Sequence, residues 1–344
     1  MTGQAHARIT VHAGEADRAD GGFLADALLD RFDDAALDCA VLLRCTSGFG
    51  VRSGLRTDQL LTLSIDLPIL AIGMGERTLV DSLAASIEDL GPVGLVTIEP
   101  IIWDGEWSAS PNSAVISSAA LVGQEQRLTV VVGSKPKVDG ISPHVAIVDA
   151  LRQAGIAGAT AFCGVDGLRA GKRLRASIMA PTAEVPVVII SFGSTEAIRA
   201  ASDQIKTSAP GAVLSYGPVT VCKRDGQLLE PPPSTSTWQR LSVYHGEQSR
   251  SRGRSLSAQL IPALRGAGVA GATSLRGIWG YHGDHTPHGD RLLSLRRRVP
   301  VMTTVVERGD GIAAAWDVID DFTDESGLVT SEPLETVRSR AGHR

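Results

Sequence analysis

The sequence lacks the features that mark several large classes of protein. Its 344 residues carry a formal net charge of −5, so there is no basic excess of the kind that binds nucleic acid. No stretch approaches the ~20 consecutive apolar residues that span a bilayer, and the N-terminus shows no basic-then-apolar signal pattern. We therefore expect a cytoplasmic protein with no nucleic-acid partner and no membrane insertion.

Cysteines and catalytic motifs are also scarce. The four cysteines form no C-x-x-C pair, which indicates free thiols in a reducing compartment. There is no G-x-S-x-G, no H-E-x-x-H and no Rossmann glycine fingerprint, and the Gly-Lys pair at 171–172 has the wrong spacing for a P-loop. No pair of carboxylates with a nearby histidine recurs along the chain. We therefore expect no enzymatic activity and no required cofactor.

What the chain has in abundance is repetition. AGIAGATAFCGVDG at 154–167 returns as AGVAGATSLRGIWG at 267–280, with eight identical positions, and a diverged copy stands at 35–48. A second phrase recurs with the same offsets of 119 and 113 residues, as RITVHAGEADRADG at 8–21, RLTVVVGSKPKVDG at 127–140 and RLSVYHGEQSRSRG at 240–253. A period near 115 residues is too long for a solenoid and indicates three copies of a whole domain.

Changes in composition between the copies mark two linkers. The first is small and polar, and the second contains a Pro triplet followed by Ser and Thr, which is typical of an extended spacer. The predicted organisation is repeat 1 at 6–104, a linker at 105–125, repeat 2 at 126–225, a linker at 226–237, repeat 3 at 238–338 and a tail at 339–344.

Each copy shows the same order of predicted elements. A β-branched run precedes an amphipathic helix, two further strands flank a loop of about twenty residues, and a second helix and a last strand follow. This is the β-α-β-β-α-β order of ferredoxin-like domains, which places both helices on one face of an antiparallel sheet. Because the other face needs cover, we predict an α+β fold in which three sheets pack together as an intramolecular pseudo-trimer. The alternative is three separate units that each dimerise elsewhere.

One motif suggests a family. R-x-x-x-G-F-G at 44–50, with GE-x-x-R-x-x-G upstream at 14–21 and similar phrases in the third copy, resembles the PII-like family catalogued as "domain of unknown function 190". This family is a distant relative of the PII nitrogen-signalling trimers. The resemblance implies a trimer written into one chain, and hence a monomer in solution. It also implies ligands in the clefts between units and a long loop between strands two and three that contacts a target, such as a membrane transporter or channel.

Candidate ligand residues lie on loops that meet at one edge of each predicted sheet. Glycines let backbone N–H groups approach a ligand, and the arginine fork suits phosphate or carboxylate. The structural alternatives are tight turns for the glycines and solvated or ion-paired loops for the charges. Cys163 replaces the arginine in the middle copy, so we expect that cleft to be altered. The candidates are Glu15, Arg18, Arg44, Gly48, Phe49, Gly50, Lys137, Gly167, Glu247, Arg250, Arg276, Gly277, Gly280 and Tyr281.

These observations lead to two hypotheses of function. The first is a PII-like signal-transduction protein that binds an anionic small ligand, such as an adenine nucleotide. The short final loop DLGPVG lacks the basic, glycine-rich phosphate clamp of PII, which weakens the case for ATP itself. The alternative is a metal-binding protein of the trimeric cation-tolerance type, because His282, His285 and His288 could ligate a divalent metal.

Overall fold

The computed structural model describes residues 5–50, 53–57, 66–91, 94–104, 125–135, 140–169, 171–175, 184–282, 287–289, 299–323 and 327–339. Within these ranges the protein is a mixed α/β structure with six helices and antiparallel sheets, as the sequence predicts. No helix in the described ranges is long and apolar enough to cross a membrane.

The first unit pairs four long strands in one sheet and packs two helices on it. The sheet order is β4-β7-β1-β8. The helix that follows the first strand buries Leu28, Leu29 and Phe32 against the sheet, at the three- and four-residue spacing of one helix face. In chain order the elements are β1 (His6–Gly14), α1 (Leu24–Asp34), β4 (Cys39–Arg44), β7 (Pro68–Glu76), α2 (Arg77–Glu88) and β8 (Leu95–Trp103).

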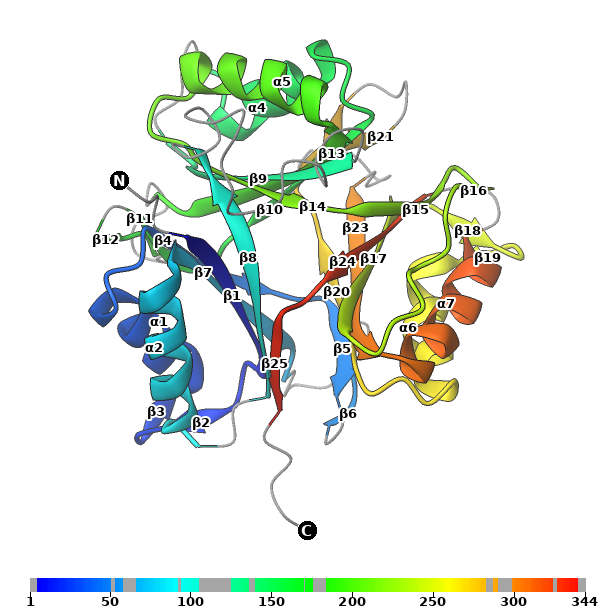
Figure 1. Ribbon diagram of the computed structural model, residues 1–344, viewed down its shortest axis with the longest axis horizontal. Helices are drawn as coiled ribbons and strands as arrows, with labels where there is room; N and C mark the ends of the chain where they lie inside the picture. The colour runs from blue at the N-terminus through cyan, green and yellow to red at the C-terminus, as the bar shows by residue number, and fades with distance from the viewer. Residues whose placement is uncertain are drawn as a thin grey trace.

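The second and third units repeat this element order and this strand order (Figure 1). The second consists of β9 (Glu125–Gly133), α4 (Pro143–Gln153), β10 (Gly158–Cys163), β13 (Pro186–Ser194), α5 (Thr195–Ser208) and β14 (Val213–Pro218). The third consists of β17 (Trp238–Gly246), α6 (Leu256–Gly266), β20 (Ala272–Arg276), β23 (Pro300–Arg308), α7 (Asp310–Phe322) and β24 (Leu328–Pro333). The three sheets surround the middle of the molecule, and the helix pairs lie on the outside.

A short strand from each unit crosses to the sheet of another. The crossing strands are β5 (Ser47–Gly50), which pairs with β20, β11 (Asp166–Arg169), which pairs with β4, and β21 (Trp279–His282), which pairs with β10. Each continues into a hairpin with β6 (Ser53–Thr57), β12 (Lys172–Arg173) or β22 (His288–Gly289). The first unit therefore pairs with the third, the third with the second, and the second with the first.

The last strands of the units form a second set of connections. The end of β8 pairs with β14, at Trp103–Ser215 and Ile102–Tyr216. Two further strands, β15 (Thr220–Arg224) and β25 (Thr336–Ser339), pair with β24 and β8 respectively. Each pair of units is thus joined by backbone hydrogen bonds at two places.

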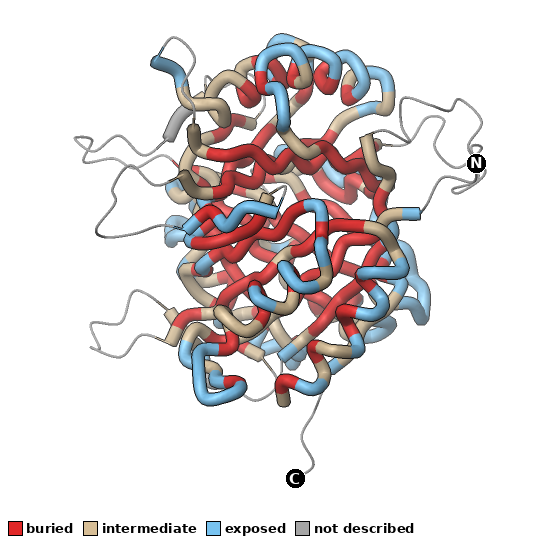
Figure 2. Tube along the Cα trace, turned by 90° about the vertical axis from the view of Figure 1, so that its left-hand side faces the viewer, coloured by how far each residue is buried: buried red, intermediate tan, exposed pale blue. Residues whose placement is uncertain are grey.

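Apolar side chains fill both faces of the sheets. Each unit has its own core between sheet and helices. A fourth cluster draws on the opposite faces of all three sheets, and it includes Leu43 and Met74 from the first unit, Phe162 from the second and Leu275 and Met302 from the third. Figure 2 shows the buried residues running through the middle of the molecule. The faces without helices are therefore buried against one another.

Candidate functional site

A charged pair lies at one edge of the first unit. Arg44 is the last residue of β4, and Glu15 follows the end of β1. The guanidinium donates to Oε2 of Glu15 from Nε at 3.0 Å and lies within 2.9 Å of it at Nη2. Both side chains are about half exposed, at 46% and 40%. The two candidates therefore lie together and are open to solvent.

The third unit carries the same pair, and the second unit lacks it. Nη2 of Arg276 donates to Oε2 of Glu247 at 2.8 Å, while the buried Nε of Arg276 has no hydrogen-bond partner among the described residues. In the second unit, Ser134 and Cys163 stand at the two positions. Both members of the pair are thus replaced in the second unit, so the charged pair is present in the first and third units and absent from the second.

The charged pairs adjoin the places where units are joined. Thr46, two residues after Arg44, donates its backbone N–H to the carbonyl of Ser274 in the third unit at 2.9 Å. Ile278, two residues after Arg276, donates to the carbonyl of Ala161 in the second unit at 2.8 Å. Each arginine therefore lies two residues from a backbone hydrogen bond between two units.

The other predicted charged residues lie apart from these pairs. Arg18 places its guanidinium carbon 3.8 Å from the ring centroid of Phe23, within a hairpin of β2 (Arg18–Ala19) and β3 (Gly22–Phe23). Arg250 donates from Nη1 to the carbonyl of Gly253 at 2.9 Å, within a hairpin of β18 (Arg250–Ser251) and β19 (Arg254–Ser255). Lys137 lies outside the described residues.

Most of the predicted glycines lie at strand contacts between units. A Cβ on Gly48, Gly167 or Gly280 would lie 2.6, 2.3 or 2.4 Å from a carbonyl oxygen of the neighbouring unit. Those carbonyls belong to Ala272, Ala40 and Ala159. Such distances are too short for any side chain, so these equivalent glycines let strands of different units approach one another. Gly277 meets Ala161 and Pro300 in a similar way, and Gly50 pairs with Ser53 in the β5–β6 hairpin.

The two predicted aromatic ligand residues are packing residues. Phe49 is 7% exposed and belongs to the core of the third unit. Tyr281 lies in the core of the second unit, where its hydroxyl donates to the carbonyl of Ile156 at 2.7 Å. Leu168, the equivalent residue of the second unit, packs in the core of the first. Each crossing strand thus inserts one large side chain into a neighbouring core, so Phe49 and Tyr281 have a packing role, and their ligand role stays a prediction from the sequence.

The predicted histidine set falls largely outside the described residues. His282 ends β21, the backbone of His288 lies in β22, and His285 is not described. Across the described ranges there is no group of three or more His, Cys, Asp or Glu side chains that could hold a metal ion. The metal hypothesis remains a prediction from the sequence.

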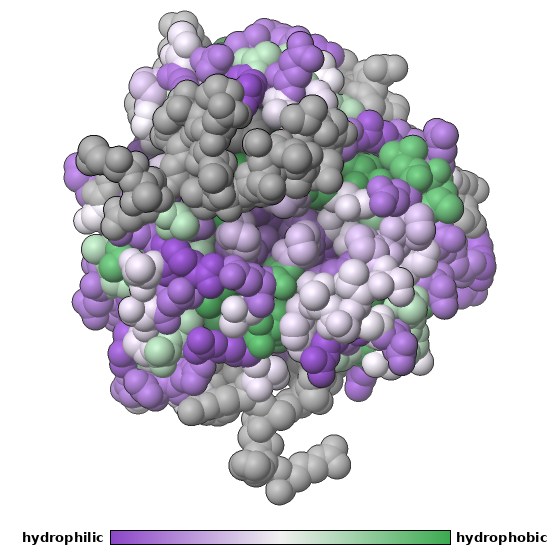
Figure 3. All heavy atoms as spheres, in the orientation of Figure 1, coloured by the Kyte–Doolittle hydropathy of each residue, from purple (hydrophilic) through white to green (hydrophobic). Residues whose placement is uncertain are grey.

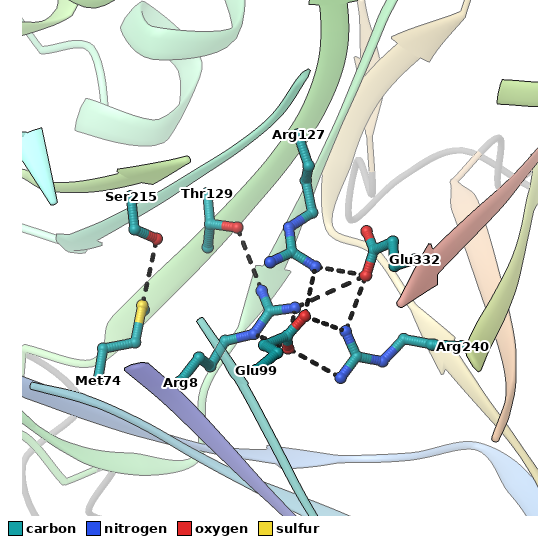
Figure 4. Close-up of polar contacts among 8 residues, drawn as sticks. All are labelled: Arg8, Met74, Glu99, Arg127, Thr129, Ser215, Arg240 and Glu332. Atoms are coloured by element: carbon teal, nitrogen blue, oxygen red, sulfur yellow. Dashed lines mark hydrogen bonds and ion pairs between the residues drawn. The ribbon is translucent and has the colours of Figure 1, made fainter. Parts of the chain in front are cut away.

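A buried charged cluster joins all three units (Figure 4). Arg8, Arg127 and Arg240 occupy the same position in β1, β9 and β17, and they meet Glu99 of β8 and Glu332 of β24. All five residues are at most 8% exposed. We call these five residues the axial cluster.

Arg240 bridges the two glutamates of the axial cluster. It donates to Glu99 at 2.9 and 3.1 Å and to Glu332 at 2.8 Å. Arg8 binds Glu99 at 2.5 Å, and Arg127 binds Glu332 at 2.5 Å. Burial alone would raise the pKa of Glu99, but Arg240, Arg8 and Arg127 outweigh it and hold that pKa well below its usual range. Burial and the charge of Arg127 together lower the pKa of Arg8 to about 10.

The sequence predictions did not include this cluster, although a signal was present. Arg8, Arg127 and Arg240 align within strands whose neighbours are apolar. A charged residue at the same place in three apolar strands indicates a buried charge network, because a single buried guanidinium needs partners. The acidic partners were harder to predict, because the second unit has Gly217 at the strand position that faces its arginine.

Acid is expected to destabilise the fold through a buried histidine. Burial lowers the pKa of His245 to about 4, although its contact with the Gly246 carbonyl opposes this shift. Because the unfolded chain takes up the proton first, stability is full above the unfolded pKa of about 6.5 and falls as the pH drops below it. We expect this residue to lower the free energy of unfolding by about 2 kcal/mol when the pH falls from 7 to 5. Denaturant unfolding at both pH values should show a smaller loss for His245→Asn, and equal losses would contradict the assignment.

Comparisons with solved structures give weak matches. An aspartate kinase from Synechocystis shares 12% identity with a TM-score of 0.25; the match covers 94% of this chain and 43% of the kinase. The chain thus spans less than half the length of that kinase. An anthrone oxidase-like protein shares 10% identity over 62% of this chain and 93% of its own, with a TM-score of 0.18. TM-scores this low carry no inference about fold or function.

The comparison with family models is specific. The model of one family, described as "DUF190: Uncharacterized ACR", matches residues 6–102, 125–221 and 238–336. The three matches follow the three structural units and together cover most of the chain. The protein therefore belongs to the DUF190 family, of which it carries three tandem copies.

Proposed function

We propose that this protein is a PII-like regulator in which three ferredoxin-like domains, at 6–104, 126–225 and 238–338, form an intramolecular trimer. It binds an anionic small ligand at the two edges marked by Arg44 and Arg276, and an adenine nucleotide is the first ligand to test. The long loops between the second and third strands contact the regulated target, and a membrane transporter or channel is our candidate for it.

The observation that carries this proposal is the pair of Arg–Glu contacts at equivalent edges, one about half exposed and the other about one-third exposed. A phosphate or carboxylate accepts two parallel hydrogen bonds from a guanidinium and can replace the glutamate there. Glu15 and Glu247 each use one oxygen on their arginine, at 2.8–3.0 Å. These glutamates hold the arginines in place and leave each guanidinium partly exposed, at 46% for Arg44 and 26% for Arg276.

Regulation requires the ligand to favour one arrangement of the protein over another. Arg44 and Arg276 lie two residues before backbone hydrogen bonds that join different units. A ligand that displaces Glu15 or Glu247 leaves a free carboxylate beside that junction and the start of the long loop. The energy difference between the paired and displaced arrangements can therefore act on the loops.

Isothermal titration calorimetry with ATP, ADP, AMP and cyclic AMP tests the proposal. We expect two sites per chain for the nucleotide that binds, since the middle unit lacks both charged residues. Arg44→Ala and Arg276→Ala should each weaken one site about 10- to 100-fold, because each removes charge-assisted hydrogen bonds. Arg338→Ala is the matched control, since Arg338 is 40% exposed and forms an ion pair with Glu88. Three equal sites, or binding that neither variant changes, would contradict the proposal.

A further inference from the structure

The axial cluster has one more positive than negative side chain. In the first unit Arg8 faces Glu99 directly across the β1–β8 pair, and in the third unit Arg240 faces Glu332 across the β17–β24 pair. In the second unit the residue that faces Arg127 is Gly217. Three buried guanidiniums therefore share two carboxylates.

Arg127 is the arginine without a carboxylate of its own. Its Nη1 contacts Glu332 at 2.5 Å and Glu99 at 3.5 Å, and Arg240 donates to both of those glutamates. Arg127 is only 4% exposed, and its buried Nε has no hydrogen-bond partner among the described residues. A buried guanidinium with an unused donor is unfavourable unless a negative group completes its contacts.

Among the described residues there is space for a Cβ at Gly217. A Cβ built on Gly217 would meet one described atom within 4 Å, Nη2 of Arg127, at an ordinary contact distance of 3.5 Å. In the other two units the corresponding strand position carries the carboxylate of Glu99 or Glu332. In the space-filling view, hydrophilic side chains lie near the middle of this face (Figure 3).

We propose that Arg127 binds a small monovalent anion beside Gly217, in the place that corresponds to the carboxylates of Glu99 and Glu332. The ligand class is a halide or a short carboxylate such as formate or acetate, because the anion takes the place of a single carboxylate group. The bound anion balances three guanidiniums with three negative groups. Since the arginines come from three units, it also stabilises the contacts among those units. This site is separate from the edges at Arg44 and Arg276.

Thermal unfolding in different sodium salts tests the proposal. At fixed ionic strength, replacing gluconate by chloride, formate or acetate should raise the melting temperature of the natural chain. The rise should be about 2 °C for each tenfold increase in anion concentration above its dissociation constant. Comparing chloride with formate and acetate shows whether the site prefers a halide or a short carboxylate. Gluconate serves as an anion too large for the position.

Two variants make the result specific to this site. Gly217→Glu supplies the third carboxylate from the chain itself, and Arg127→Met removes the uncompensated charge. For each of these two variants, the melting temperature should be the same in all four salts. Gly217→Gln is the control that adds a side chain of similar size without a charge. In ³⁵Cl NMR, the natural chain should broaden the chloride line and Arg127→Met should not. The proposal is overturned if the natural chain does not distinguish chloride and the carboxylates from gluconate. It is also overturned if either folded variant keeps the full response.

Discussion

Replacing Glu99 by glutamine is expected to lower the free energy of unfolding by about 3–5 kcal/mol. Glu99 accepts hydrogen bonds from Arg8 and Arg240 and lies 3.5 Å from Arg127. A neutral amide at this position leaves three buried guanidiniums with one carboxylate. The size of the side chain is unchanged, so the loss reports the charge and the broken hydrogen bonds. Urea unfolding of both proteins measures it.

Arg127→Met is the matched control for this prediction. It also removes one buried charge from the axial cluster, but it leaves two arginines with two glutamates. We expect a loss smaller than that of Glu99→Gln, because replacing a buried charge by an apolar side chain of similar length costs little when the remaining charges balance. If Arg127→Met were as destabilising as Glu99→Gln, the charge count would not govern the stability of the cluster.

Truncating Phe49 to alanine is expected to cost about 3–5 kcal/mol. The residue belongs to the first unit, yet its side chain is buried in the core of the third. The substitution therefore leaves a cavity in the core of the third unit and weakens the contact between the first unit and the third. Phe23→Ala is the control, because Phe23 is 45% exposed and its loss should cost no more than about 1 kcal/mol. Denaturant unfolding of the two variants separates the effects, and comparable losses would count against a packing role for Phe49.

The sequence was sufficient to predict the elements of each unit. The period of the repeated phrases located three copies, and the alternation of β-branched runs with amphipathic helices predicted the antiparallel sheets and the helices that the structure contains. This worked because strand and helix periodicity are local properties of the chain. The charged edges were predicted correctly in one respect, since Glu15 and Arg44 do lie together.

The contacts between units could not be predicted from the sequence patterns. The crossing strand β5 is only four residues long and contains two glycines, so residues 47–50 resemble a loop. An apolar residue in such a loop fits equally well in a ligand site or in the core of another unit, and periodicity does not distinguish these roles for Phe49. The same holds for Gly48. A side chain there would clash with the carbonyl of Ala272, a residue far away in the sequence.

Differential scanning calorimetry of the natural chain and of Phe49→Ala tests most directly whether the three units form one body. Because every pair of units shares strands and a central core, we expect a single transition whose calorimetric and van't Hoff enthalpies agree. Phe49→Ala should move this whole transition to lower temperature. Separate transitions for the units, with only one of them shifted by the substitution, would contradict the account.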